Sequence, residues 1–472
     1  MPSIPATIFR AYDIRGQFPS ELNTDNIKLI GAAIASEALD CGINTLLLAR
    51  DARLSSPELH RALLAAILAT GCDVVDLGIV PTPLLYFATH TLRWHSGVML
   101  TASHNPADYN GLKIVFERSC LANNQIQQIR KRIEDGQFQR GKGEILDFKS
   151  SLDAAMPDSS IENIKQAYVK YLSQDIELSR PLKIVIDCGN AVSGIIAPEL
   201  FKQLGCDTSL LFCQLDGNFP NHHPDPTVAE NLRQLRDKVI ASQADLGIAF
   251  DGDGDRLGLV TNRGEIIDAD KMLMLLAKHI LPKYPGSDVV CDVKCSSKLF
   301  AMIEAYGGKA VVHRSGHSYM KQKMQATGAC LGGEYAAHIF IKDRWFGFDD
   351  GLYTAARIIE ILCHDPRSSS QVFASFPSGI STGEIKIEMS DSEKFHFMDK
   401  LISYAHFKDC KINLIDGLRV DFDYGWGLIR ASNTSPALLL RFEADSTAQL
   451  ESIKAMFKAL LRQVDSQLIT NF

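Results

Sequence analysis

The sequence predicts an α/β fold with three similar α/β domains, each containing a βαβ unit, and a C-terminal α+β domain, arranged around a central active-site cleft. Three observations support this class. A chain of 472 residues is too long for one hydrophobic core. One strand–loop–helix–strand pattern occurs three times, beginning at Thr45, Leu182 and Asp288. Beyond about residue 378 the apolar residues alternate, as in antiparallel strands.

The three repeats share a short, β-branched apolar run that ends in an aspartate, at Asp51, Asp187 and Asp292. A loop of small or polar residues follows each aspartate, and an apolar-periodic segment then ends at a glycine before a second apolar run. This is the βαβ pattern, which requires a crossover helix and favours a parallel sheet. Because the spacing between repeats varies, the pattern indicates duplicated domains and not a solenoid.

Two polar segments, at 149–164 and 364–379, have the composition of linkers. They place the first and the last domain boundary, and the middle boundary follows the "DGDGDR" segment described below. The four predicted domains are 1–153, 154–265, 266–376 and 377–472.

Composition excludes several classes of function. A net charge of −7 argues against broad nucleic-acid binding, which draws on surplus Lys and Arg. No apolar stretch approaches the roughly 18 residues of a membrane span, and the N-terminus lacks a secretory pattern, so we expect a cytoplasmic protein. Its 11 cysteines fit reduced thiols. A zinc site at Cys291 and Cys295 is disfavoured because no partner pair has the expected spacing.

The segment "DGDGDR" carries the most specific chemical signal. An apolar run delivers three carboxylates, Asp251, Asp253 and Asp255, and the glycines between them allow the backbone to curl so that all three can meet. Hard oxygen ligands favour Mg²⁺. An EF-hand would need Gly and Glu where Arg256 and Asn262 stand. An acidic surface hairpin remains the alternative.

The segment "TASHNP" places Ser103 at the end of another apolar run. Ser103 and His104 could act as nucleophile and base, but adjacent residues of a strand point to opposite faces, and no GxSxG elbow surrounds them. A phosphoserine that Mg²⁺ can neutralise fits better. A loop-capping serine is the alternative.

Four motifs, "TASHNPADYNGLKIV", "DGDGDR", "GGEYAAHIF...RWFGFDDG" and "RASNTSP", occur in this order along essentially the whole chain. Together they resemble the α-D-phosphohexomutase family, most closely its bacterial phosphomannomutase/phosphoglucomutase branch. The resemblance implies an isomerase that interconverts hexose 1-phosphates and 6-phosphates, of mannose and also of glucose, and so supplies nucleotide-sugar precursors. A phosphoserine would give its phosphoryl group to the sugar, and a hexose 1,6-bisphosphate would serve as intermediate and activator.

By resemblance, Ser103 is the phosphoserine, and it contributes to Mg²⁺ binding together with Asp251, Asp253 and Asp255. Lys113, on the following strand, could return beside the serine and stabilise charge or move a proton. Arginine offers the bidentate geometry that phosphate prefers. The resemblance places further residues in the same cleft: Tyr12, Arg15, His104 as a loop-ordering residue, and Arg256.

Sugar recognition is expected in the third domain, where Glu334 can accept hydrogen bonds from two sugar hydroxyls and His338 is a candidate acid or base. A Gly-Gly bend should precede them. The family commonly has Ser where this chain has Ala336, which puts one hydroxyl contact in question. Lys294 and His317 match further cleft positions. The phosphate grip is expected from the C-terminal domain: Arg430, Ser432, Asn433 and Thr434, with a polar hairpin as the alternative.

Three other functions stay open from the sequence. An amino-sugar mutase of the same family typically has an "RxSGTEP" loop where this chain has "RASNTSP". A noncatalytic sugar-phosphate-binding relative would fit Ala336, and a hydrolytic phosphatase would use similar groups. We read the histidines of "NFPNHHPDPT" as part of an ordered loop without a metal. We expect a monomer whose partners are small hexose phosphates, without nucleic acid or membrane.

Overall fold

The computed structural model describes residues 4–152, 161–390, 392–432, 435–468 and 472. The chain forms two compact units. The first unit comprises residues 1–272 and 336–373, and the second comprises residues 273–335 and 374–472. Residues 336–373, which the sequence assigns to the third domain, therefore belong to the first unit. The chain enters the second unit within helix α8 (Ala269–Ile280).

The first sheet has the order β1-β5-β4-β2-β3, with β6 paired to β5. Its strands are β1 (Ile14–Gln17), β2 (Thr45–Arg50), β3 (Asp73–Ile79), β4 (Gly97–Leu100), β5 (Tyr109–Phe116) and β6 (Ser119–Cys120). Strand β2 runs parallel to β3 and β4, whereas β4 is antiparallel to β5. The central parallel trio is what the first repeat predicts.

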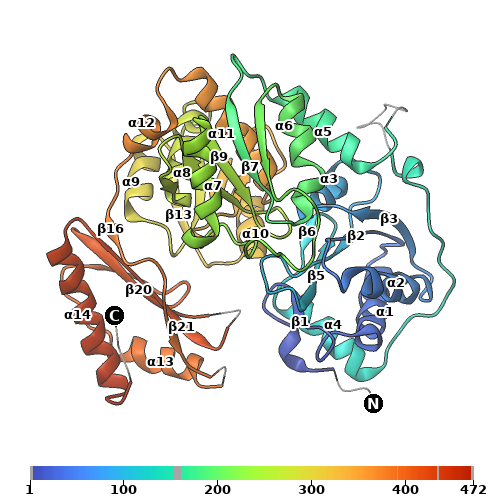
Figure 1. The fold of residues 1–472 in the computed structure, drawn as a ribbon. Coiled ribbons are helices and arrows are strands. Elements are labelled where there is room, and N and C mark those ends of the chain that lie inside the picture. Colours follow the sequence, from blue (N-terminus) through green and yellow to red (C-terminus); the bar gives the residue numbers. More distant parts are fainter. Residues whose placement is uncertain (1–3, 153–160, 391, 433–434, 469–471) are drawn as a thin grey trace. The chain divides into compact units, whose positions relative to one another are not determined.

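Four helices accompany this sheet: α1 (Thr24–Asp40), α2 (Ser56–Leu68), α3 (Thr82–Thr91) and α4 (Asn124–Asp135). Helices α1 and α2 lie side by side, and α4 packs on α1 (Figure 1). Helix α1 begins where the side chain of Asn23 accepts hydrogen bonds from the backbone of Asp25 and Asn26. The apolar faces of these helices and of the strands form a single buried core.

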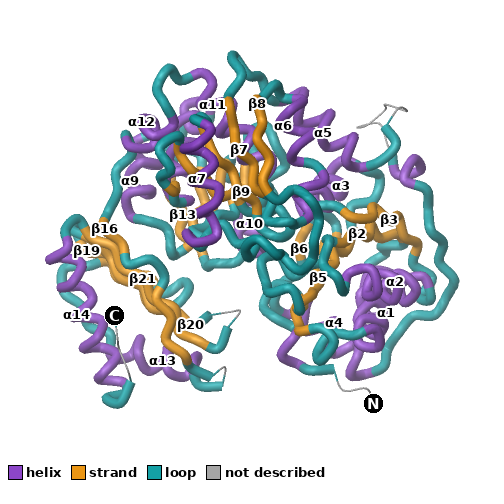
Figure 2. The backbone as a smooth tube through the Cα atoms, viewed as in Figure 1, coloured by secondary structure: helices purple, strands orange, loops and turns teal. Residues whose placement is uncertain are grey.

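The second sheet has the order β11-β10-β9-β7-β8. Figure 2 shows its strands β7, β8 and β9 in orange. Its strands are β7 (Lys183–Asp187), β8 (Asp207–Leu211), β9 (Leu246–Phe250), β10 (Leu257–Thr261) and β11 (Ile266–Ile267). Strand β7 runs parallel to β8 and β9, and β9 is antiparallel to β10. Its helices are α5 (Ile164–Asp175), α6 (Ala197–Gln203) and α7 (Arg233–Ser242). Strand β15 (Ile339–Ile341) and helix α11 (Gly351–His364) also belong to this unit, and α11 packs on β9 and β10.

The second unit contains the third repeat. Strands β12 (Asp288–Asp292), β13 (Lys309–His313) and β14 (Leu331–Gly333) are parallel, with β12 between the other two. Helices α9 (Ser297–Ala305) and α10 (His317–Thr327) connect them. The orders β3-β2-β4, β8-β7-β9 and β13-β12-β14 are equivalent. This confirms the predicted threefold repetition of one α/β design.

The C-terminal part is an antiparallel sheet with the order β16-β21-β20-β19-β18. Its strands are β16 (Ile380–Ser381), β17 (Ile385–Glu388, paired with β21), β18 (Lys411–Asn413), β19 (Leu418–Phe422), β20 (Gly425–Ala431) and β21 (Ala437–Ala444). Helix α12 (Ser369–Ala374) precedes them, and α13 (Lys394–Tyr404) and α14 (Thr447–Val464) pack on the sheet around a separate core. The predicted α+β domain is thereby confirmed.

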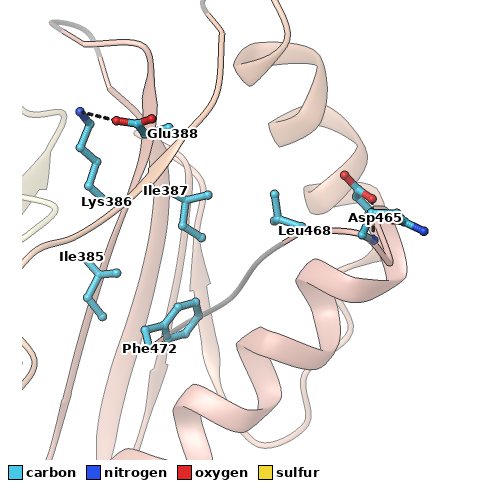
Figure 3. Close-up of a pocket in the computed structure, with 8 residues that line it drawn as sticks. Ile385, Lys386, Ile387, Glu388, Asp465, Leu468 and Phe472 are labelled. Atoms are coloured by element: carbon cyan, nitrogen blue, oxygen red, sulfur yellow. Dashed lines mark hydrogen bonds and ion pairs between the residues drawn. The ribbon is translucent and has the colours of Figure 1, made fainter.

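One pocket of this C-terminal domain, of about 470 Å³, lies beside β17. Figure 3 shows Ile385 and Ile387 of β17 together with Leu468 and Phe472 from the end of the chain. None of the residues that the sequence singles out for chemistry lines it. In the described parts of the chain, no helix is long and apolar enough to cross a membrane.

Candidate active site

Ser103 lies just beyond the end of β4, in a turn with a positive φ of 51°. Its side chain is buried, and its backbone N–H donates to the hydroxyl of Thr101 at 3.0 Å. The strand end predicted for this serine is confirmed. The turn aims the hydroxyl away from the direction that a continued strand would give it.

Two loops carry the predicted chemistry: residues 101–108, between β4 and β5, form the serine loop, and residues 251–256, between β9 and β10, form the metal loop. Asp251 accepts hydrogen bonds through Oδ1 from the backbone of Gly254, at 2.9 Å, and of Arg256, at 3.2 Å, which curls the loop. Gly254 has a positive φ of 81°, as the spacing predicts. Gly252 is needed for a different reason, because a Cβ there would lie 2.1 Å from the carbonyl oxygen of Ser103.

The serine and metal loops meet inside the first unit. Ser103 Oγ donates to Asp251 Oδ2 at 2.8 Å. Asp251, Asp253 and Asp255 each offer an oxygen within 4.8 Å of the others, and all three side chains are fully buried. Thr82, at the start of α3, fixes this loop by donating from its backbone and hydroxyl to Asp253.

Lys113 of β5 brings a buried positive charge to the carboxylates. Its Nζ donates to Asp253 Oδ2 at 2.7 Å and also to Asp255 Oδ2. Burial alone would lower the pKa of Lys113, but the two aspartates raise it well above its ordinary value. The ammonium group therefore stays charged throughout the physiological range.

The carboxyl groups of Asp251 and Asp255 differ in how readily they ionise. Burial and the neighbouring charges of Asp255 and Asp253 raise the pKa of Asp251 well above its usual range. Burial opposes ionisation of Asp255 too, but Lys113 and His338 overcome it and hold the pKa of Asp255 well below the ordinary value. Three ionised carboxylates at this spacing require more positive charge than Lys113 supplies, which is the electrostatic condition for cation binding.

The donor set fits a hard cation. Asp253 Oδ1 is buried and receives no hydrogen bond from the described residues, and Asp255 Oδ1 faces only His338 Nε2, at 3.2 Å. Buried carboxylate oxygens without donors are costly unless a cation or water satisfies them. The three aspartates could therefore hold a divalent metal ion through oxygen ligands.

His338 lies against the metal loop. Its Nε2 is 3.2 Å from Asp255 Oδ1 and receives a hydrogen bond from Arg256 Nε at 3.1 Å. A short antiparallel bridge between Arg256 and His338 holds the two backbones together. Asp349 Oδ2 lies 4.0 Å from the same nitrogen. The guanidinium of Arg256 is also 3.9 Å from Asp251 Oδ2.

The structure corrects the expectation that Ser103 and His104 point to opposite faces. Ser103 Oγ and His104 Nδ1 are 3.2 Å apart, because the residues form a turn and not a strand. Burial, followed by the charges of Arg256 and Arg15, lowers the pKa of His104 well below its ordinary value. His104 is therefore a neutral neighbour of the hydroxyl near neutral pH.

Arg15 of β1 approaches the serine loop from the sheet. Its Nη1 donates to Asn105 Oδ1 at 2.6 Å, and its Nη2 pairs with Asp13. Strand pairing places Arg15 opposite Gly111 of β5. Tyr12 is half-buried three residues earlier. Despite the cost of burial, Asp13 and Tyr12 raise the pKa of Arg15.

Predicted sugar-recognition residues of the third repeat lie at strand and helix ends of the second unit. Glu334 follows β14 and accepts a hydrogen bond from the backbone of Gly316 at 2.6 Å. His317 begins α10, and its Nδ1 is 3.1 Å from Lys321 Nζ. The predicted bend at Gly332 and Gly333 is wrong, since both residues belong to β14.

Lys294 follows β12, and its Nζ donates to Glu384 at 3.5 Å. Although burial disfavours the charge, Glu384 and Asp292 raise the pKa of Lys294. The Nζ atom of Lys294 also lies 5.8 Å from the ring centroid of Tyr335.

Arg430 lies one residue before the end of β20, and its Nε donates to Asp416 Oδ2 at 3.0 Å. The same carboxylate accepts from the backbone of Ser315 at 2.9 Å. Ser432 Oγ accepts hydrogen bonds from the backbone and hydroxyl of Ser435. Asn433 and Thr434, the other two residues predicted for the phosphate grip, lie outside the described residues.

Sequence reasoning missed Arg53, which shapes the serine loop. This buried guanidinium donates to the carbonyls of Ser103, Asn105, Pro106 and Tyr109 at 2.5–3.0 Å. Asp51 pairs with it and accepts from Thr101. The only signal for Arg53 in the sequence was its neighbour Asp51, which the first repeat places at the end of β2.

The chain matches all four domain families of one enzyme group. Phosphoglucomutase/phosphomannomutase alpha/beta/alpha domains I, II and III match residues 6–140, 161–264 and 268–378, and the C-terminal domain matches residues 384–460. The boundaries drawn from the sequence remain predictions in their details.

Similar proteins cover the whole chain. A phosphomannomutase/phosphoglucomutase of Pseudomonas aeruginosa is 50% identical over 471 residues, covering 100% of this chain and 99% of that protein. A phosphoglucomutase of Neisseria gonorrhoeae is 43% identical over 465 residues, 98% of each chain. A crystal structure of a phosphoglucomutase/phosphomannomutase family protein from Burkholderia thailandensis superposes with a TM-score of 0.93 at 42% identity, covering 100% of both chains. The chain therefore belongs to the phosphoglucomutase/phosphomannomutase family of phosphohexomutases, which are isomerases.

Proposed function

We propose that Ser103 carries the phosphoryl group in a reversible transfer between O1 and O6 of a hexose phosphate. The observation that supports this most directly is the 2.8 Å hydrogen bond from Ser103 Oγ to Asp251, within a fully buried cluster of three carboxylates and one lysine. A phosphoryl group on this oxygen would lie beside the oxygen ligands of a cation, as phosphoryl transfer requires.

Mg²⁺ is the proposed ion, held by Asp251, Asp253 and Asp255 with an oxygen from the phosphorylated Ser103. When bound, it supplies charge neutralisation at the phosphoryl oxygens. The buried Oδ1 atom of Asp253, which receives no hydrogen bond from the described residues, supports this assignment.

The first half-reaction follows from the residues around Ser103. A free hydroxyl of the sugar phosphate attacks the phosphorus, a new P–O bond forms, and the bond to Ser103 Oγ breaks. The released serine oxygen takes up a proton and becomes the hydroxyl that donates to Asp251. Lys113 stays charged and stabilises the transferring group, so we propose it as an electrostatic catalyst rather than a base. Arg15 and Arg256 supply the further positive charge on this side.

His338 is proposed to accept the proton of the attacking hydroxyl. Its Nε2 lies at the edge of the metal loop, 3.2 Å from Asp255 Oδ1, and it would take up the proton once Arg256 turns its Nε–H toward the phosphoryl group. His104, neutral and 3.2 Å from Ser103 Oγ, orders the serine. The intermediate is a hexose 1,6-bisphosphate, which also primes dephosphorylated enzyme. It reorients in the site, and in the second half-reaction its other phosphoryl group passes to Ser103 by the same steps in reverse.

Mannose and glucose phosphates are the proposed substrates, because the relatives named above carry phosphomannomutase and phosphoglucomutase in their names. Glu334 would bind sugar hydroxyls, and Tyr12 would line the same substrate site. The remaining proposed contacts bind the phosphate that does not react: Lys294, His317, Arg430, Ser432, Asn433 and Thr434. Ala336 provides no side-chain hydroxyl, so one contact to the sugar is absent or comes from another group. A cytoplasmic location and a monomeric state stay proposals.

The proposal is tested by mass and by rate together. Intact-mass measurement should find one phosphoryl group, and it should be absent from Ser103→Ala. Rates are then compared on mannose 1-phosphate, glucose 1-phosphate and glucosamine 1-phosphate, with a hexose bisphosphate as primer. Isomer formation on the first two supports the proposal. Faster release of inorganic phosphate than of isomer would instead indicate a phosphatase, and no turnover at all a binding protein.

A further inference from the structure

Two cysteines outside the proposed catalytic groups lie face to face in the second repeat. Cys188 follows β7 directly, and Cys213 lies two residues beyond β8. Their sulfur atoms are 3.5 Å apart, and both are free thiols. A disulfide needs an S–S distance of about 2.05 Å, so a shift of about 1.5 Å would join them.

The backbone holds these two thiols together. Strands β7 and β8 are parallel, with Asp187 opposite Leu211 at their ends. Beyond the strands, the N–H of Cys188 donates to the carbonyl of Leu211 at 3.1 Å, and the N–H of Asn190 to that of Phe212 at 2.7 Å. The backbone at the end of the sheet therefore keeps the two residues side by side.

We propose that Cys188 and Cys213 are a reversible oxidation site, at which a hydroperoxide forms a disulfide that lowers mutase activity. In the first step the Cys213 thiolate attacks the peroxide: an S–O bond forms, the O–O bond breaks, and the leaving oxygen takes up a proton. Cys188 then attacks the oxidised sulfur, the S–S bond forms, the S–O bond breaks, and water leaves with the Cys188 proton. The two sulfurs lose two electrons to the peroxide, and a dithiol reductant reverses the change.

The two thiols are suited to different steps. Cys213 is half-buried and so open to a small oxidant, whereas Cys188 is fully buried. The hydrogen bond between the sulfurs lowers the pKa of Cys213, and the same bond together with burial raises the pKa of Cys188. Cys213 is therefore the attacking thiolate and Cys188 the resolving thiol.

The link to activity runs through the loop after β7. Ser193 of this loop lies against the metal loop, since a Cβ at Gly254 would be 2.6 Å from its hydroxyl. The next residue, Gly194, lies against Cys213, because a Cβ at Gly194 would be 2.1 Å from the Cys213 carbonyl oxygen. Because these contacts are close, we expect a backbone shift at Cys188 to displace the metal loop, and a displacement of about 1 Å there can cost ~100-fold in rate.

The test uses the full-length protein with Mg²⁺. Reduced enzyme is treated with hydrogen peroxide, digested with trypsin without reduction, and assayed in parallel on glucose 1-phosphate. We expect peptides 184–202 and 203–233 to appear as a linked pair, two hydrogen atoms lighter than the sum of the free peptides. Activity should fall severalfold as the pair forms and return after treatment with dithiothreitol.

Three variants separate this site from general oxidation. Cys213→Ser and Cys188→Ala should keep their activity in peroxide and form no linked pair. Cys206→Ser, which removes the other thiol of peptide 203–233, should behave like the unchanged protein. Absence of the linked pair would contradict the proposal, and so would a linked pair at full activity, or an equal loss of activity in Cys213→Ser. A melting curve of each variant confirms that it is folded.

Discussion

Arg53 shows how one buried side chain can set the geometry of a reacting group that it does not touch. Its guanidinium donates to four carbonyl oxygens of the serine loop, including that of Ser103 itself. Because Ser103 has a positive φ, the loop needs such support to hold the hydroxyl toward Asp251. The residue is a positioning group and not a catalytic one.

We expect Arg53→Met to lower kcat by about 100-fold while KM for the sugar phosphate changes little, because the misplaced loop holds the serine out of line. Arg53→Lys should recover part of this loss by supplying some of the hydrogen bonds. Kinetics and the phosphorylated fraction of Ser103 are the measurements. Arg130→Met, at a partly exposed ion pair, is the matched control. An unchanged kcat in folded Arg53→Met would show that the loop holds its shape alone.

His222 gives a pH-dependent contribution to stability. Its Nε2 lies 3.0 Å from Asp187 Oδ2, and although burial opposes the charge, Asp187 raises the pKa of His222. The charged form is favoured in the folded state, so this stabilisation is fully present below the unfolded-state pKa of about 6.5 and is lost as pH rises through the raised folded-state pKa.

Replacing His222 by Asn should therefore cost most stability at pH 5.5 and least at pH 9, with a difference on the order of 1 kcal/mol or less between the two. Urea unfolding of both proteins at each pH measures it. A cost that is equal at both values, or larger at pH 9, would mean that the Asp187–His222 contact acts only as a neutral hydrogen bond.

At the scale of elements, the two active loops constrain each other through a glycine. A methyl group at Gly252 would overlap the carbonyl oxygen of Ser103, because its Cβ would lie only 2.1 Å away. Gly252→Ala should separate the metal and serine loops and lower kcat by about 100-fold. The loss of stability should be only about 1–3 kcal/mol, since the loops can move apart.

The control for this variant is Gly286→Ala. Gly286 has a positive φ of 77° but open space around its Cβ position, so it reports the cost of backbone strain alone. Steady-state kinetics and thermal melting of both variants distinguish the two effects. Equal activity in the two variants would remove the close approach of the loops as a requirement for catalysis.

The strands, the repeated βαβ units and the metal loop could be predicted because their signals are local. Equivalent strands end at or just before Asp51, Asp187 and Asp292. The three aspartates of the metal loop can be recognised from their spacing. Arg53 and Asp349 could not be found this way, since their partners are distant in sequence. The geometry of Ser103 and His104 was wrong because a positive φ at a non-glycine residue leaves no pattern in the sequence.

For the whole molecule, the division into two units has a thermodynamic consequence. Every proposed metal ligand lies in the first unit, and the C-terminal sheet has a core of its own. A ligand that binds only the folded state stabilises it by about 2.7 kcal/mol at 100 times its Kd. We therefore expect calorimetry to resolve two transitions, of which Mg²⁺ raises only one.

Asp253→Asn should abolish the response to Mg²⁺ and leave the second transition unchanged. If Mg²⁺ raises the midpoint temperatures of both transitions, the two units unfold cooperatively and are not independent in stability. If it moves neither, the three aspartates do not bind the ion. Chelation should remove activity in the unchanged protein, and added Mg²⁺ should restore it.

Lys113 also bears on how the protein survives loss of its ion. The ammonium group sits between Asp253 and Asp255 and offsets part of their charge from within the fold. A chain with a built-in counter-charge does not have to unfold when divalent ions become scarce. We therefore expect the ion-free protein to stay folded though inactive, and to resume turnover when Mg²⁺ returns without having to refold.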